Sequence, residues 1–230
     1  MHNMTAHMSA KTKHYEKVYE RFTAPISECY DCGRHCAPLN DGEPVCCSTD
    51  NAMPIVDTAE WKLLKRRTRM WHKLKPRGTD QRDIINGLDK DSCAIECRGA
   101  AHCERDNRSM SCRTFPFFPY LTKGREFVGL AYYWSFEDRC WVIANLRIVD
   151  KSFIKQFVYV YEYLFQKDDA WQQAYHAESA SMRRVFSRWK RRIPLIGRAG
   201  EKLWVLPNSG GEIVPAKERE FKLPDGISLY

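Results

Sequence analysis

The chain has 230 residues, 43% of them hydrophobic and 29% charged, which suits a globular protein with one main domain and excludes a disordered chain. Its first residues are polar and lack the apolar core of a secretory signal, and no later stretch is apolar over the length that a bilayer requires. Lys and Arg outnumber Asp and Glu by 37 to 29, so the net charge of +8 makes the surface attractive to nucleic acid, an anionic membrane surface or an acidic partner. We therefore expect a cytoplasmic protein that does not span a membrane.

The first half of the chain is predicted to combine short helices with two cysteine-rich loops. Residues 14–22 have the pattern of a short helix within an N-terminal extension, residues 1–24. Residues 29–47 and residues 93–112 each hold several cysteines among small and charged residues, without sustained periodicity. We expect both segments to be loops shaped by the groups that their cysteines bind.

Regular structure is expected between the two cysteine groups. Residues 53–56 predict a short strand. Asp57 or Thr58 then caps a helix whose apolar residues extend to Trp71. Because proline cannot continue a helix, we expect this helix to end at Pro76.

The second half of the chain is predicted to form a hairpin followed by two helices. Residues 126–134 and 140–149 are rich in β-branched and aromatic side chains, which favours two paired strands. Apolar residues at helical spacing follow Lys151 and again follow Asp169, and they predict an antiparallel helix pair that packs on the sheet. Pro194 is expected to close the second helix.

The end of the chain predicts a small hairpin, because apolar runs at residues 203–206 and 212–214 flank an Asn-Ser-Gly-Gly turn; a poorly ordered tail follows. The predicted fold class is α+β, with metal-nucleated cysteine-rich loops, a small antiparallel sheet and a C-terminal helix pair. The predicted division is an N-terminal extension (1–24), a cysteine-cluster metal-binding domain (25–149), a helix pair packed on it (150–200), and a C-terminal hairpin and tail (201–230).

The ten cysteines are the main functional signal in the sequence. Cytosolic thiols are kept reduced, so we expect these cysteines to bind metal rather than to pair as disulfides or to remain as inert buried thiols. Thiolates are soft ligands that favour zinc, copper(I) or iron–sulfur clusters. The candidate metal ligands are Cys29, Cys32, Cys36, Cys46, Cys47, Cys93, Cys97, Cys103, Cys112 and Cys140.

The spacing of the first cysteines is typical of chelation. Cys29 and Cys32 form a C-x-x-C turn, which can place two sulfurs on one metal, and Gly33 eases the backbone just past it. Cys46 and Cys47 are adjacent, so their side chains point in different directions. This pair either reaches two metals or binds one metal through a distorted turn.

The order of these elements resembles the YkgJ-family cysteine cluster proteins, which are known as zinc- or iron-chelating domains. Their pattern has a C-x-x-C-G with a nearby Cys-Cys, an acidic helix start, and a cysteine pair that ends in C-R-x-F-P. The resemblance covers roughly residues 29–140, about half of the chain. The matching residues are Cys29, Cys32, Gly33, Cys46, Cys47, Glu60, Cys93, Cys103, Cys112, Arg113, Phe115 and Pro116, with Cys140 at the place of a last cysteine.

The C-R-x-F-P element implies a role for Arg113. A guanidinium beside the Cys112 thiolate is expected to offset the negative charge that several sulfurs impose on one metal, which makes Arg113 the candidate cofactor-binding residue. Phe115 and Pro116 are expected to wall the site from water. The alternative is a surface arginine beside a core phenylalanine.

The chain departs from the family pattern at several positions. Cys36 lies in an insertion before the adjacent cysteine pair, and Cys97 is a further additional cysteine. Arg108 is followed by Ser109 where an Arg-Pro dipeptide is common. The two histidines inside the cysteine groups are either ligands or neighbours of the ligands; they are His35 and His102.

The number of cysteines does not choose the metal, because four thiolates complete one zinc site and the same residues can hold iron–sulfur clusters. We expect zinc or an iron–sulfur cluster and rank iron first, since ten thiols exceed what one zinc needs. Three functions are consistent with this: an enzyme or maturation factor of unassigned reaction, a zinc-stabilised module, or metal storage or delivery. In the second, the basic helix around residues 183–192 would bind nucleic acid or an acidic protein. No particular protein or small-molecule partner and no oligomeric state follow from the sequence.

Overall fold

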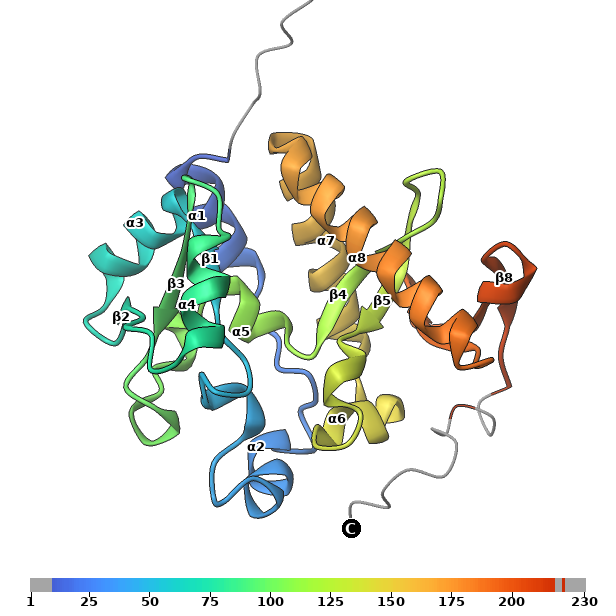
Figure 1. The fold of residues 1–230 in the computed structure, drawn as a ribbon, viewed down its shortest axis with the longest axis horizontal. Helices are drawn as coiled ribbons and strands as arrows, with labels where there is room; N and C mark the ends of the chain where they lie inside the picture. Colours follow the sequence, from blue (N-terminus) through green and yellow to red (C-terminus); the bar gives the residue numbers. More distant parts are fainter. Residues whose placement is uncertain (1–9, 218–220, 222–230) are drawn as a thin grey trace, which may run out of the picture. The chain divides into compact units, whose positions relative to one another are not determined.

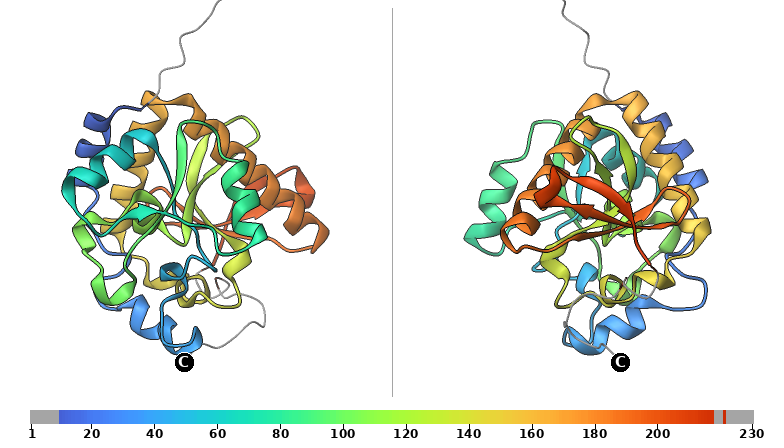
Figure 2. Two further views of the ribbon diagram at one scale, coloured as in Figure 1. Left: turned by 60° about the vertical axis from the view of Figure 1, so that its left-hand side comes forward. Right: turned by 90° about the vertical axis from the view of Figure 1, so that its right-hand side faces the viewer.

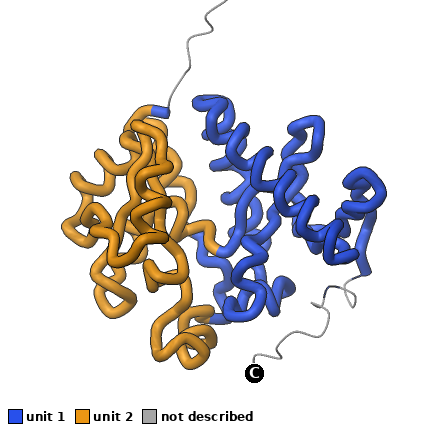
Figure 3. The backbone as a smooth tube through the Cα atoms, in the orientation of Figure 1, with its two compact units in different colours: residues 1–10, 24–30, 116–230 blue, residues 11–23, 31–115 orange. Residues whose placement is uncertain are grey.

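The computed structural model describes residues 10–217 and Phe221, and the chain forms two compact units (Figure 3). Unit 2 contains residues 11–23 and 31–115, and the other described residues belong to unit 1. The predicted α+β class is confirmed, because helices and small antiparallel sheets occur together. The outer parts of the predicted extension (1–24) and tail (201–230) lie outside the described residues.

Unit 2 is built on a three-stranded antiparallel sheet in the order β1-β3-β2 (Figure 1). Its helices are short, and several are single 3₁₀ turns. In chain order the elements are α1 (Thr12–Arg21), α2 (Cys32–Cys36), η1 (Ala37–Leu39), η2 (Val45–Cys47), β1 (Ile55–Asp57), α3 (Thr58–Arg67), β2 (His72–Lys73), α4 (Thr79–Asn86), β3 (Ser92–Glu96), η3 (Ala100–His102), η4 (Arg105–Asn107) and α5 (Met110–Thr114).

The predicted start of α3 is confirmed, and its predicted end is wrong. The Asp57 carboxylate accepts a hydrogen bond from the Glu60 N–H at 2.8 Å, which satisfies a free donor of the first helical turn. The helix ends at Arg67 because Thr68 is extended, with φ −155°. Trp71 lies beyond this end, where its indole N–H donates to the Asn107 carbonyl at 2.7 Å.

The two cysteine groups contain more regular structure than the expected loops. In the first group, Asp31 caps α2 by accepting from the Gly33 N–H at 3.0 Å. In the second, Cys93 lies on the central strand β3 and Cys112 lies on α5. Elements this short carry no readable period in the sequence, which is why the prediction missed them.

Unit 1 is built on a five-stranded antiparallel sheet in the order β4-β5-β6-β7-β8. Two long helices, α7 and α8, accompany this sheet (Figure 2). In chain order the elements are β4 (Phe117–Leu121), β5 (Phe127–Tyr132), η5 (Trp134–Phe136), α6 (Trp141–Ala144), η6 (Leu146–Ile148), α7 (Lys151–Lys167), α8 (Asp169–Arg188), β6 (Ile193–Gly197), β7 (Lys202–Leu206), η7 (Pro207–Ser209) and β8 (Glu212–Pro215).

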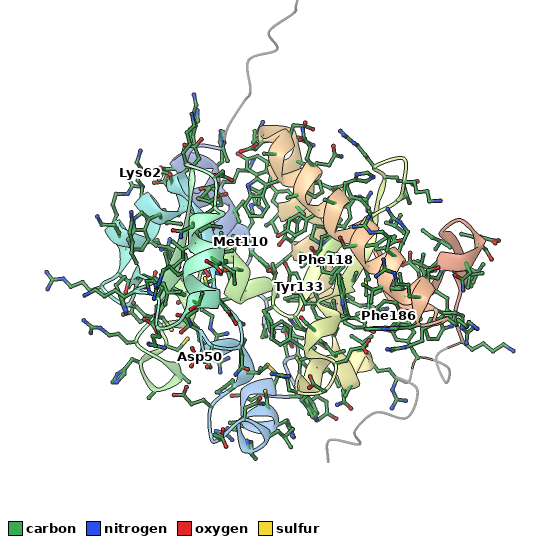
Figure 4. The ribbon with its side chains drawn as sticks, viewed as in Figure 1. Asp50, Lys62, Met110, Phe118, Tyr133 and Phe186 are labelled. Atoms are coloured by element: carbon green, nitrogen blue, oxygen red, sulfur yellow. The ribbon has the colours of Figure 1, made fainter. Side chains whose placement is uncertain are left out.

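The predicted helix pair is confirmed, and it packs on the sheet of unit 1. The Phe153 ring of α7 lies 5.9 Å from the Phe117 ring of β4, measured between centroids. On α8, the buried Ser179 hydroxyl accepts from the Leu121 N–H of β4 at 2.9 Å. Figure 4 labels Phe118 of the same strand, a fully buried side chain in this aromatic core.

Two predictions for unit 1 are wrong. Residues 126–134 contain β5, but residues 140–149 form α6 and η6 instead of a partner strand, and β5 pairs with β4 and β6. The run Trp141–Ala144 is apolar throughout, and such a run does not distinguish a strand from a buried helical turn. Pro194 lies inside β6, whereas α8 already ends at Arg188.

The predicted C-terminal hairpin is confirmed as β7 and β8, which pair in antiparallel register from Leu203 opposite Pro215 to Leu206 opposite Glu212. Gly210 and Gly211 both have positive φ, +74° and +90°, in the connecting turn. Within the part of the chain that the structure describes, none of the helices combines the length and apolar character that a membrane span needs.

Candidate metal centre

A buried carboxylate fixes the helix that carries Cys112. Glu60 is 1% exposed, and its Oε1 accepts from the Tyr19 hydroxyl and from the Met110 N–H, each at 2.6 Å. Met110, labelled in Figure 4, is the first residue of α5. Because these two bonds reach α1 and α5 from α3, Glu60 holds three helices of unit 2 together. The N-cap of α5 is Ser109, whose hydroxyl accepts from the Cys112 N–H at 3.3 Å.

Burial raises the pKa of Glu60 to about 7, although the hydrogen bonds from Tyr19 and Met110 favour its charged form. Burial likewise raises the pKa of Tyr19, with the nearby Glu60 charge as a further cause. The sequence placed Glu60 only as an acidic residue at a helix start. Nothing in that position indicated that its side chain would be buried.

Six cysteines of unit 2 lie close enough to influence one another's ionisation, and the charge of a seventh, Cys36, contributes to the raised pKa of Cys32. The pKa of Cys46 is raised well above its ordinary value by its hydrogen bond with Cys47, by burial, and by the charges of Cys112 and Cys32. Burial raises the pKa of Cys97, and the charges of Cys47 and Cys103 add to it. We call this set the six-cysteine cluster: Cys32, Cys46, Cys47, Cys97, Cys103 and Cys112.

The cluster contains thiols of opposite character. Burial raises the pKa of Cys112 to about 12, and the charges of Cys97 and Cys47 act in the same direction. The pKa of Cys47 is lowered to about 7, first because the Cys46 thiol hydrogen-bonds to it and further because of the Arg108 charge. Cys47 is thus the member that ionises most readily near neutral pH.

Arg108 is the cation that contacts the cluster. Its Nε donates to the Cys103 sulfur at 3.1 Å. Burial acts to lower the pKa of Arg108, but the hydrogen bond with Cys103 and the charges of Cys112 and Cys46 raise it overall. One guanidinium therefore faces several sulfurs, which is the charge arrangement that a set of thiolates requires.

Arg113 directs its hydrogen bonds elsewhere. Its guanidinium donates to the carbonyls of Arg108 at 3.0 Å, of Asp106 at 2.6 Å, and of Phe22. The same group lies over the Tyr19 ring, 4.5 Å from its centroid. These contacts tie α5 to neighbouring segments of unit 2. The arginine with a sulfur contact is Arg108. It stands where the family pattern has Arg-Pro, and that position was the sequence signal that could have indicated its role.

The other predicted cysteine ligands occupy different surroundings. The buried Cys36 sulfur accepts from the Val45 N–H and from the Asn40 amide, both at 3.3 Å. The pKa of Cys93 is raised by burial, and its charged neighbours are Lys73 and carboxylates rather than cysteines. The two remaining cysteines belong to unit 1, where one is exposed and the other buried; they are Cys29 and Cys140. None of the ten cysteines, all of which lie among the described residues, is in a disulfide.

The residues fit a thiophilic metal by their chemistry, but they do not form a complete ligand set. Among residues 10–217 and Phe221, no group of three or more His, Cys, Asp or Glu side chains is arranged to hold one ion. His35 lies on α2 and His102 on η3, beside cysteines in sequence. The cluster thus brings six soft donors into one region of unit 2 without arranging three of them around one ion.

Comparisons of the chain with protein-family models, with curated proteins and with solved structures found no match. The functional argument therefore depends on the residues of this chain and their surroundings.

Proposed function

We propose that the six-cysteine cluster of unit 2 binds a thiolate-ligated metal, either zinc or an iron–sulfur cluster. The observation that carries this proposal is the mutual electrostatic influence of six sulfurs, five of which also interact with Arg108, together with the hydrogen bond from Arg108 Nε to the Cys103 sulfur. Six thiols exceed the four that one tetrahedral zinc or one four-iron cluster uses. The donors that would hold the metal are therefore a subset of Cys32, Cys46, Cys47, Cys97, Cys103 and Cys112.

The raised pKa values of Cys46 and Cys112 support the proposal because they express a charge problem that a metal resolves. Neighbouring buried thiolates repel one another, so in the absence of a cation the protons remain bound. A divalent cation reverses this preference, since thiols that coordinate a metal lose their protons. Bound zinc would supply folding free energy to unit 2, and a bound iron–sulfur cluster would supply electron transfer.

Arg108 supports the same interpretation. Four thiolates around Zn²⁺ leave a net charge of about −2, and a guanidinium with a hydrogen bond to one sulfur reduces that charge. The order of these cysteines also resembles the YkgJ-family pattern, although no family model matches the chain. Every member of the cluster except Cys97 matches a cysteine of the family pattern.

The test is metal analysis of the full chain after anaerobic purification, combined with visible absorption. We expect stoichiometric metal: iron with visible absorption for an iron–sulfur cluster, or zinc in a colourless protein. Cys112→Ser and Cys47→Ser should each lower the bound metal by more than half. Cys93→Ser is the matched control in the same unit, and it should leave the metal content unchanged.

Two results would contradict the proposal. One is a wild-type protein that is free of metal and remains so after incubation with zinc or after iron–sulfur reconstitution. The other is equal loss of metal in the Cys93→Ser control and in the cluster variants while all of them remain folded by circular dichroism.

A further inference from the structure

A basic groove lies on unit 1, apart in sequence from every cysteine of the cluster. It has a volume of about 530 Å³ and is formed by α8 together with the β4–β5 turn and the start of η7. Most of the side chains that line it are basic. The residues used below are Lys123, His176, Arg183, Arg184, Ser187 and Arg188.

The helical contributors share one face of α8. Position 176, position 180, the pair 183 and 184, and the pair 187 and 188 follow one another at steps of three or four residues, so they lie along one side of the helix. The β4–β5 turn is joined to this face by the His176 ring, whose Nε2 lies 3.3 Å from the Lys123 carbonyl oxygen. The sequence showed this helix to be basic, but the turn that completes the groove was not predictable from the sequence.

Arg183 is the fixed centre of the groove. It is 8% exposed, and its Nη1 donates to the Leu121 carbonyl at 2.7 Å and to the Tyr120 hydroxyl at 3.0 Å. Its guanidinium lies over the Tyr120 ring, 5.4 Å from the centroid. A Cβ on Gly211 would lie 3.3 Å from the Arg183 Cδ, so the β7–β8 turn also confines this side chain. The guanidinium is thus held in place before any ligand binds.

The groove cations lack carboxylate partners. Across the described residues, no Asp or Glu lies within salt-bridge distance of Lys123, Arg183, Arg184 or Arg188. Other arginines of unit 1 are paired with carboxylates: Arg139 with Asp138, Arg191 with Glu137, and Arg198 with Glu162. Four permanent positive charges therefore converge on one groove without an internal counter-charge.

We infer that this groove binds a small ligand that carries two adjacent phosphates. The volume falls within the usual range of small-molecule sites, about 300–1,000 Å³. The planar guanidinium of arginine can donate two hydrogen bonds to the oxygens of a phosphate group. Four cations also match a ligand with several negative charges better than they match a ligand with a single carboxylate. A diphosphate carries several negative charges on two adjacent groups, and it is short enough to lie along the single helical turn from Arg184 to Arg188. This inference is independent of the metal proposal, because it involves none of the cysteines.

The experiment is calorimetric titration of the full chain with inorganic pyrophosphate, at low and at high salt. The test variant is Arg184→Gln/Arg188→Gln, since both side chains are exposed. The matched control is Lys151→Gln/Lys155→Gln, which removes two exposed charges from α7 in the same unit. We expect saturable binding that weakens at high salt, and a loss of affinity of about 10-fold or more in the test variant, because charged hydrogen bonds contribute at this scale. The control should bind within about twofold of wild type.

Three results would overturn the inference. Pyrophosphate could fail to bind at millimolar concentration, or the α7 control could lose as much affinity as the groove variant, which would indicate only general charge attraction. The third is binding of a single-stranded oligothymidine that pyrophosphate does not displace, because the groove would then follow a nucleic-acid backbone instead.

Discussion

Replacing Glu60 with Gln is predicted to change how the stability of the protein depends on pH. The folded pKa is about 7 against an ordinary value of 4.5, because the carboxyl group is buried. At 1.36 kcal/mol for each factor of ten in proton affinity, this difference corresponds to about 3 kcal/mol. Because the folded protein binds this proton more tightly than the unfolded chain, the contribution is fully present below about pH 4.5 and is lost as pH rises to about 7.

The Glu60→Gln variant removes this titration while keeping both hydrogen bonds. Its Oε1 still accepts from the Tyr19 hydroxyl and from the Met110 N–H. Near pH 5, the variant and the wild type should have similar free energies of unfolding, because the wild-type carboxyl is protonated. At pH 8, the variant should be more stable than the wild type by about 2–3 kcal/mol.

The assay is urea unfolding of both proteins at several pH values from 5 to 8, with the metal content measured at each. The quantity of interest is the difference in unfolding free energy between variant and wild type, since other titrating groups cancel in it. Glu20→Gln is the control, because it removes an exposed carboxylate from α1. The account of Glu60 as a buried carboxyl group with a raised pKa is refuted by either of two results. The difference in unfolding free energy between Glu60→Gln and wild type could be constant over this pH range, or it could equal the difference found for the control.

Two further predictions concern the core of unit 1. Gly129→Ala should destabilise the protein by about 2 kcal/mol or more in urea unfolding, because its Cβ would lie 2.1 Å from the Ile196 carbonyl oxygen. Gly124→Ala meets only ordinary contacts and should change stability by less than about 0.5 kcal/mol; equal effects would contradict the close approach of β5 and β6. Phe157→Ala should cost about 3–5 kcal/mol because the ring is fully buried on α7. Tyr159→Ala, on the exposed side of the same helix, should cost less than about 1 kcal/mol, and a smaller effect at Phe157 than at Tyr159 would show that the helix faces are assigned incorrectly.

The long elements were predictable from the sequence because their periodicity spans several turns. The apolar residues of α7 repeat at helical spacing, and the side chains at Phe153, Phe157, Tyr161 and Leu164 are all buried. The short elements were not predictable in this way. Residues 140–149 form helical turns although they resemble a strand, because a short apolar run satisfies either structure.

The sequence could predict that the candidate site consists of cysteines, but not which of the ten cysteines lie together. The sequence identified the cysteines, yet only tertiary structure shows that Cys97 joins the six-cysteine cluster while Cys93 lies among charged side chains. These two residues are four positions apart, because Cys93 lies near the start of β3 and Cys97 directly follows its last residue, so the strand separates them. The sulfur contact of Arg108 also depends on how residues 103–108 turn, which no sequence pattern specified.

The central claim is that cluster sulfurs coordinate a metal, and X-ray absorption at the metal edge of the anaerobically purified full chain tests it most directly. The account predicts a first shell dominated by sulfur at about 2.3 Å, as in thiolate sites. The amount of metal with this sulfur shell should fall by more than half in Cys112→Ser and remain unchanged in Cys93→Ser. A first shell of oxygen and nitrogen only, at about 2.0–2.2 Å, would contradict the account, because it would place the metal away from these cysteines.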